Sequence, residues 1–194
     1  MKKYTGFTLI ELMVVIAIVA LMAVLAAPSF KQMIQSSAIS SAVNSFMADM
    51  RFARSEAIRR GGSVVLCRSN SPEATDPNCG TGSGTGGNGW VTGWFVFHDL
   101  DGDKGKDANE PVLRAQGPLT SLDSALETSG GSSSTKFRFT PTGRLVSLGS
   151  ATGIQFGGAD FPTEQQRLVC ISVGGRARVA VDANGKPTGD ASCN

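Results

Sequence analysis

The hydrophobic positions of this chain form three successive patterns, and the first is a continuous apolar run at the N-terminus. Residues 7–27 carry a single charged side chain, Glu11, and follow a short basic leader. A run of this length predicts a helix that spans a bilayer, over residues 7–28. An acid at the centre of a membrane helix costs about 2.5–3.5 kcal/mol, so Glu11 is expected to be functional and to have a partner. An ordinary signal anchor with an incidental acid is the alternative.

The second pattern is a single apolar stripe over residues 29–61. Its members recur at spacings of three and four, which is typical of an amphipathic helix that packs on a globular body: Ile39, Val43, Phe46, Met47, Met50, Ala53 and Ala57. Gly61 and Gly62 are expected to end the helix. Both patterns together predict one helix of about 54 residues, roughly 80 Å long, that Pro28 bends or loosens.

The third pattern is a series of short β-type segments over residues 62–194. Strands are expected at Ser63–Cys67, Trp90–Phe97, Pro111–Arg114, Lys136–Phe139, Ile154–Phe156, Arg167–Val173 and Arg176–Val181. Gly174-Gly175 predicts a two-residue hairpin turn, and the Gly/Ser-rich segments 80–89 and 129–135 predict loops. The aromatic side chains of the second segment are assigned to the core rather than to a ligand site: Trp90, Trp94, Phe95 and Phe97. The expected fold class is α+β, a long N-terminal helix with an antiparallel sheet on its C-terminal half.

The composition favours this β-rich head and argues against an enzyme. The chain has 24 glycines and few aromatic residues. Its one histidine, His98, has no nucleophile motif to accompany it, and no phosphate-binding loop of the Walker type is present. We therefore expect no catalytic residue and no cofactor.

Four cysteines suggest two disulfides, because an even count on an exported chain is typical of an oxidising compartment. Three pairings are open. We favour Cys67–Cys79 and Cys170–Cys193, since each closes a local loop that is rich in glycine and polar residues. The single histidine makes a zinc site an unfavourable alternative.

Residues 6–12 (GFTLIEL) resemble the processing site of type IV pilins and pseudopilins. The resemblance implies that a prepilin peptidase removes leader residues 1–6 by cleavage between Gly6 and Phe7, and that the new Phe7 amine is methylated. It implies that the apolar helix is kept and that Glu11 pairs with the N-terminal amine of a neighbouring subunit during assembly. The protein would be a single-pass inner-membrane protein with its head in the periplasm, and would later join a filament through this helix.

The rest of the chain resembles the GspH/FimT subgroup of minor pilins and pseudopilins. The similarity is carried by Arg51–Ala57 at the helix end, and by Trp90–Asp99 with Pro111–Arg114 in the head. The partners that it implies are other pilin or pseudopilin subunits.

A pair of arginines near the C-terminus is the best candidate for a ligand site. Strand alternation places Ala177, Val179 and Val181 on the core face, so that Arg176 and Arg178 project together about 7 Å apart. Two adjacent guanidiniums suit phosphate, and Gly175 is expected to let the backbone approach a ligand. Ordinary surface arginines are the alternative. Five further cations are expected to widen the patch: Lys136, Arg138, Arg144, Arg167 and Lys186.

Resemblance adds a ligand to this arginine pair. Residues 175–178 (GRAR) resemble the G-R-x-R pattern of FimT-type minor pilins that bind DNA during natural transformation. Without Lys2 and Lys3 of the leader, the formal charge of +2 falls to about zero. A polyanion would therefore need a local patch, and its binding would depend on salt and not on base sequence.

An acidic segment over residues 99–110 is a candidate calcium loop. The acids at relative positions 1, 3, 5, 9 and 12 match the register of calcium ligands: Asp99, Asp101, Asp103, Asp107 and Glu110. Lys104 stands at the position where such loops need glycine, and the flanks look like strands instead of paired helices. A solvated hairpin loop is the alternative.

Two function classes follow from these patterns. One is a minor type IV pilin whose head binds DNA during uptake. The other is an H-type pseudopilin, a structural tip component of a type II secretion system. Only the arginine hairpin separates them within the sequence, and it favours the pilin.

Overall fold

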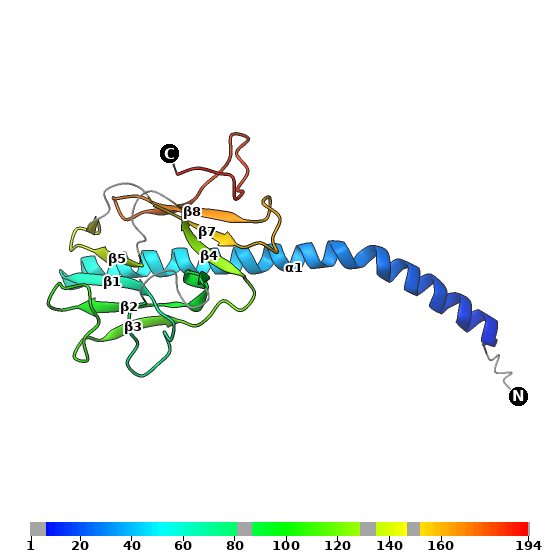
Figure 1. Cartoon of the computed structure of the whole chain (residues 1–194), viewed down its shortest axis with the longest axis horizontal. Helices are drawn as coiled ribbons and strands as arrows, with labels where there is room; N and C mark the ends of the chain where they lie inside the picture. The colour runs from blue at the N-terminus through cyan, green and yellow to red at the C-terminus, as the bar shows by residue number, and fades with distance from the viewer. Residues whose placement is uncertain (1–6, 81–86, 129–134, 147–151, 194) are drawn as a thin grey trace, which may run out of the picture.

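In the computed structural model, one long helix extends out of a β-rich head that packs on its C-terminal half (Figure 1). The structure describes residues 7–80, 87–128, 135–146 and 152–193. Helix α1 runs over Leu9–Arg60, 52 residues, and continues through Pro28. Its free N-terminal half curves away from the head (Figure 1). Gly61 ends it in a left-handed conformation, with φ 62°, and donates its backbone N–H to the carbonyl of Ala57.

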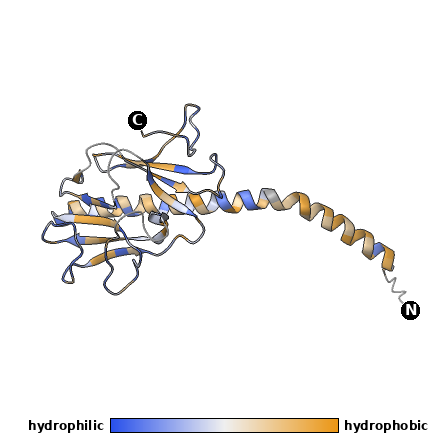
Figure 2. Ribbon diagram, viewed as in Figure 1, coloured by the Kyte–Doolittle hydropathy of each residue, from blue (hydrophilic) through white to orange (hydrophobic). Residues whose placement is uncertain are grey.

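The two halves of α1 differ in what surrounds them, as the two sequence patterns predicted. Figure 2 shows an N-terminal half that is mostly apolar, and its large hydrophobic side chains are exposed from Phe7 to Ile34. The C-terminal half buries one stripe: Ile39, Val43, Phe46, Met50, Ala53 and Ala57 are at most 3% exposed. Met47, the other predicted member, is partly buried.

Within the described residues, nine strands and one short 3₁₀ helix follow α1. They are β1 (Ser63–Arg68), η2 (Trp90–Thr92), β2 (Trp94–Asp99), β3 (Val112–Gln116), β4 (Ser124–Thr128), β5 (Lys136–Phe139), β6 (Leu145–Val146), β7 (Thr152–Gly157), β8 (Arg167–Ile171) and β9 (Ala177–Val179). They form two antiparallel sheets, of order β3-β2-β1-β5-β6 and β4-β7-β8-β9. The α+β class is confirmed, but the single sheet that the pattern suggested is divided into a five-stranded and a four-stranded sheet. Both contact the same half of α1 (Figure 1).

Several predicted strands have different bounds for local reasons. The segment Trp90–Phe97 divides into η2 and β2, because Gly93 between them has φ 104° and no room for a side chain. Strands β4 and β6 were not predicted, since β4 buries only Ala125 and β6 has two residues. The predicted strand Arg176–Val181 shortens to β9, and Val181 beyond it is 47% exposed, so its assignment to the core was wrong.

Phe46 of α1 is the centre of the core between the two sheets. Its ring meets Trp90 edge-on at 5.3 Å and Trp94 at 5.5 Å, and it also contacts Phe137 and Phe156. The tryptophans are fully buried, which confirms their assignment to the core. Edge-to-face aromatic pairs of this kind add about 0.5–1.5 kcal/mol each beyond their buried area.

Phe95 and Phe97 are also buried, but in a second cluster. They lie on the other face of the five-stranded sheet with Val65 and Cys67. Their rings are 5.5 Å apart. The Cys67–Cys79 disulfide covers this cluster, so the sheet is apolar on both faces.

A buried acid on α1 joins the helix to the five-stranded sheet. Asp49, 5% exposed, accepts hydrogen bonds from Trp94 Nε1 at 2.8 Å and from Arg114 Nη1 at 2.8 Å. The same guanidinium lies 4.4 Å from the centre of the Phe52 ring. The guanidinium and the indole together satisfy the hydrogen-bonding capacity of the buried carboxylate. Loss of the carboxylate would leave the Trp94 N–H buried without an acceptor.

We predict that Asp49→Ala lowers the free energy of unfolding by about 1–3 kcal/mol, because it leaves the indole N–H unsatisfied. Asp49→Asn keeps an acceptor and is expected to cost less. Thermal unfolding of the full chain in nonionic detergent, followed by tryptophan fluorescence, measures both. The exposed Asp190→Ala is the control. An unfolding temperature equal to wild type for Asp49→Ala would contradict the proposed role of this bond.

Candidate functional site

The N-terminal processing segment is only partly described. Gly6 lies outside the described residues, and Phe7 precedes α1 with 88% of its surface exposed. Helix α1 is long and apolar enough to cross a membrane, and the apolar stretch is not buried by any part of this chain that the structure describes. Cleavage at Gly6-Phe7 and methylation of Phe7 stay predictions.

Glu11 has a local partner that the sequence analysis did not recognise. Its Oε2 accepts hydrogen bonds from the backbone N–H and the hydroxyl of Thr8, both at 3.2 Å. The Glu11 N–H donates in return to Thr8 Oγ1 at 3.3 Å, so the two residues form a capping box at the start of α1. The pattern T-x-x-E in residues 8–11 was the available signal. Glu11 is exposed, and its pairing with the amine of a neighbouring subunit stays a prediction.

The predicted two-residue hairpin turn is a five-residue loop, residues 172–176, which we name the arginine loop. Its ends are set by the pairing of Ile171 with Ala177. Ser172 N–H donates to the Arg176 carbonyl at 2.9 Å, and Gly175 N–H donates to the Ser172 carbonyl at 2.8 Å. The Ser172 hydroxyl oxygen also accepts from the Arg176 N–H at 3.3 Å. These bonds hold the backbone on which Arg176 is displayed.

Gly175 has a different role from the predicted one. It is buried with φ 77°, and a Cβ there would lie 2.5 Å from the Gly143 carbonyl oxygen and 3.0 Å from the Phe139 ring. The neighbouring Val173 carbonyl accepts from the Leu145 N–H of β6 at 3.1 Å. Gly175 therefore docks the arginine loop onto the five-stranded sheet, and its buried backbone does not form a surface for a ligand. Only Gly174 of the pair is exposed.

Arg176 and Arg178 are both exposed, on the arginine loop and on β9 respectively. Ala177 and Val179, on the other face, pack against the core, which confirms the alternation for this short stretch. Arg178 pairs in register with Cys170 of β8, so it shares the outer face of the four-stranded sheet with the Cys170–Cys193 disulfide. The two arginines are therefore exposed because the residues that alternate with them, Ala177 and Val179, face the core.

Three of the five cations that were expected to widen this patch have partners elsewhere, and a fourth, Lys186, lies away from the arginine loop. Lys136 Nζ donates to the Lys104 carbonyl at 2.8 Å, and Arg138 donates to the Gly102 carbonyl, so both serve the acidic loop. Arg167 Nη1 donates to three backbone carbonyls, and burial lowers its pKa. Lys186 lies beyond the far end of the β8–β9 ladder, in a turn closed by Asp182. Arg144 remains, beside the arginine loop.

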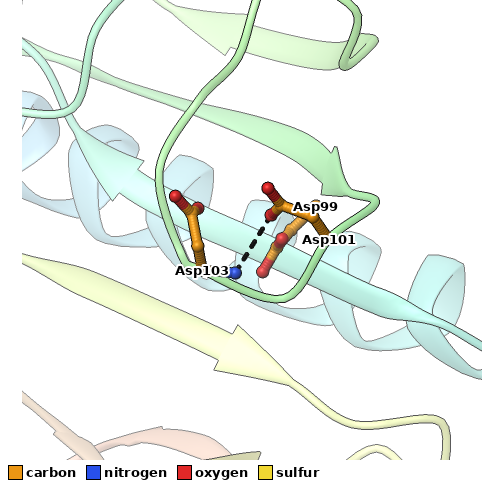
Figure 3. Close-up of side chains that lie close together, drawn as sticks. All are labelled: Asp99, Asp101 and Asp103. Atoms are coloured by element: carbon orange, nitrogen blue, oxygen red, sulfur yellow. Dashed lines mark hydrogen bonds between the residues drawn. The ribbon is translucent and has the colours of Figure 1, made fainter.

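The acidic loop places three of its five predicted calcium ligands together. Oxygens of Asp99, Asp101 and Asp103 lie within 4.8 Å of one another (Figure 3). Each carboxylate already accepts a loop N–H: Asp99 from Gly102 at 2.7 Å, Asp101 from Asp103 at 3.1 Å, and Asp103 from Gly105. Asp99 also accepts from the Ser63 hydroxyl at 3.1 Å. The loop is closed by its own hydrogen bonds.

The remaining two acids lie outside this group. Glu110 is buried and accepts from the N–H groups of Leu100 at 2.6 Å and Asp107 at 3.0 Å. Desolvation, followed by the charges of Asp101 and Asp103, raises the pKa of Asp107. The structure therefore divides the predicted ligand set, and calcium binding stays a prediction that calorimetric titration with calcium tests.

The two favoured disulfides are confirmed. Cys67 is bonded to Cys79, and Cys170 to Cys193. The first closes a loop over the second apolar cluster, and the second holds the C-terminal segment against β8.

Comparison with known proteins identifies the family. Residues 42–175, most of the chain, match the family model described as type II transport protein GspH. The chain belongs to the GspH family. Residues 1–27 also match the prokaryotic N-terminal methylation motif, which together with the apolar helix fits a pilin anchored in the inner membrane. No curated protein matches the chain.

Solved structures support the fold of this GspH-family chain. The type IV minor pilin FimU of Pseudomonas aeruginosa PAO1, in space group P21, superposes with a TM-score of 0.53 at 20% identity. The match covers 80% of this chain and 95% of FimU. A second crystal form, P65, gives 0.51 at 22% identity, over 80% and 99% of the two chains. The type IV pilin fold and the GspH/FimT-like resemblance are confirmed.

We predict that Gly175→Ala destabilises the head by about 1–3 kcal/mol, because alanine is strained at this φ and its methyl group meets the Gly143 carbonyl. Gly174→Ala is the matched control: its Cβ would come no closer than 3.7 Å to Ser172 Oγ. Thermal unfolding of both variants measures the difference. Equal unfolding temperatures would show that the loop is not docked through Gly175.

Proposed function

We propose that this protein is a minor type IV pilin whose head binds DNA through its phosphates during natural transformation. The observation that carries the proposal is the exposure of Arg176 and Arg178, on the arginine loop and on β9 of one hairpin, whose loop also contacts the five-stranded sheet. The GRAR sequence at residues 175–178 resembles the DNA-binding pattern of FimT-type pilins, and the family match supports a head of this type.

The chemistry of the arginine pair suits a phosphodiester backbone. Each guanidinium presents a planar fork of donors that matches phosphate oxygens. The side chains of the mature protein carry about zero net charge, so attraction must come from this local patch. Contacts of this kind position a duplex without reading its sequence.

We expect Arg176→Ala with Arg178→Ala to weaken DNA binding and to lower the slope of log affinity against log salt by about 2, because two phosphate contacts are lost. Fluorescence anisotropy of a labelled duplex of mixed sequence, with the full chain in nonionic detergent at several salt concentrations, measures both. Lys186→Ala, in the turn beyond the far end of this hairpin, is the control. Unchanged affinity of the double variant at low salt would contradict the proposal.

Assembly through the N-terminal helix is part of the same proposal. A prepilin peptidase would cleave between Gly6 and Phe7, and the methylated Phe7 amine would begin the mature chain. The exposed apolar half of α1 would first lie in the inner membrane, with the head in the periplasm, and then pack against other pilin or pseudopilin subunits in a filament. Glu11 would pair with the amine of a neighbouring subunit.

The substitution Glu11→Gln separates the two roles of this residue. Its amide oxygen can still accept from Thr8 and keep the capping box, but the negative charge is lost. We therefore expect the variant to remain in the membrane and to be depleted from sheared filaments, as measured by immunoblotting of both fractions. Thr8→Ala, which removes the cap and keeps the charge, is the control. Normal incorporation of Glu11→Gln would rule out the charge pairing.

The second candidate function is that of an H-type pseudopilin, a structural tip component of a type II secretion system without enzymatic activity. The family description, type II transport protein, favours it. The two functions share the anchor and the fold and differ in the ligand of the head. Absence of DNA binding by the wild-type chain would favour the pseudopilin.

A further inference from the structure

Of two arginines outside the β8–β9 hairpin, Arg144 lies beside the arginine loop, and Arg54 of α1 lies against the turn that contacts this loop. Arg144 stands between Gly143 and Leu145, and both of these neighbours contact the loop: Gly143 through Gly175, and Leu145 through the Val173 carbonyl. Arg144 is exposed. Arg54, on the C-terminal half of α1, is half-buried and lies against Gly143 of the same turn.

Gly143 is the point where the helix and the arginine loop meet. It has φ 73°, and a Cβ there would lie 2.9 Å from Arg54 Nε and 3.2 Å from Arg54 Cγ. The Arg54 side chain therefore lies along the Gly143 backbone, while the carbonyl of the same glycine faces Gly175. One buried glycine thus separates Arg54 on α1 from the loop that displays Arg176.

The turn that carries Arg144 is held rigidly. Gly143 N–H donates to the Thr140 carbonyl, and Thr140 N–H donates to the Arg144 carbonyl, both at 2.8 Å. Arg144 N–H donates to Thr140 Oγ1 at 3.1 Å. A backbone that is fixed before binding loses little conformational entropy when a ligand arrives.

These arginines differ from the other cations at the end of α1. Arg59 and Arg60 both pair with Glu56, and their hydrogen bonds, that of Arg59 first, lower the pKa of Glu56 to about 2. Within the part of the chain that the structure describes, no carboxylate pairs with Arg54, Arg144 or Arg176. Their charge is therefore not neutralised by a neighbouring acid of that part.

We propose that Arg54 and Arg144 extend the phosphate-binding surface from the arginine loop across the Gly143 turn onto the end of α1. This inference rests on the DNA-binding function proposed above and adds the path that the DNA backbone takes over the head. The DNA backbone crosses the seam between the two sheets, by which we mean the place where the arginine loop contacts the Gly143 turn. Arg178 and Arg176 lie on one side of this seam, and Arg144 and Arg54 lie on the other. The ligand is the phosphodiester backbone of a duplex, contacted without base recognition.

The test compares two pairs of substitutions in the full chain in nonionic detergent, with a labelled duplex as the probe. Arg54→Gln with Arg144→Gln is expected to weaken binding roughly tenfold or more near 0.1 M salt, and to lower the salt slope by about 2. Arg59→Gln, which removes an arginine of the same helix end whose charge is already paired with Glu56, is the matched control and is expected to bind as wild type.

Two further measurements keep the result interpretable. Thermal unfolding checks that each variant folds, because Arg54 also covers Gly143. Arg54→Lys with Arg144→Lys keeps the charges and is expected to recover most of the salt slope.

The outcomes separate this inference from the proposed function. If Arg176→Ala with Arg178→Ala loses binding while Arg54→Gln with Arg144→Gln binds with the wild-type slope, the extension is overturned and the DNA-binding function stands. If the wild-type chain does not bind the duplex, the function fails and the extension falls with it. A loss in both pairs, with Arg59→Gln unchanged, supports both.

Discussion

The burial of one apolar stripe of α1 between two sheets is the interaction on which the rest of the structure depends. The largest buried cluster needs the helix, because strands from both sheets pack around Phe46. A hydrophobic stripe on a helix must be covered, and here two separate sheets cover it. The hydrogen bonds of Asp49 then hold the helix against the five-stranded sheet. The N-terminal half of the same helix stays exposed, and it is long and apolar enough to cross a membrane.

The seam between the sheets is where the candidate ligand site lies. Few groups join the sheets there: the Leu145 N–H bond to Val173, and the close approach of Gly175 to Gly143. Both glycines have positive φ, and neither position has space for a side chain. The arginine loop is therefore displayed from a rigid support. A site that binds phosphate by charge gains from such a support, because the guanidiniums are placed before the ligand arrives.

Contacts within the chain engage other cations of the head and of the helix end. The acidic loop engages Lys136 and Arg138, Glu56 engages Arg59 and Arg60, and backbone carbonyls engage Arg167. These cations already have partners within the chain, and a polyanion would have to compete with those partners. The acidic loop itself uses its carboxylates to bind its own N–H groups, which is how a loop with several like charges remains folded.

The sequence alone determined the long helix, its division into an exposed and a packed half, and the processing motif, because periodicity and local motifs depend only on residues close in the chain. The disulfide pairing followed from short loops between Cys67 and Cys79 and between Cys170 and Cys193. Tertiary structure alone decided that the strands form two sheets, that Gly175 is buried against Gly143, and that the turn carrying Arg144 lies beside the arginine loop. These contacts join segments about thirty residues or more apart, and no local pattern of hydrophobic and polar positions encodes which of them will meet.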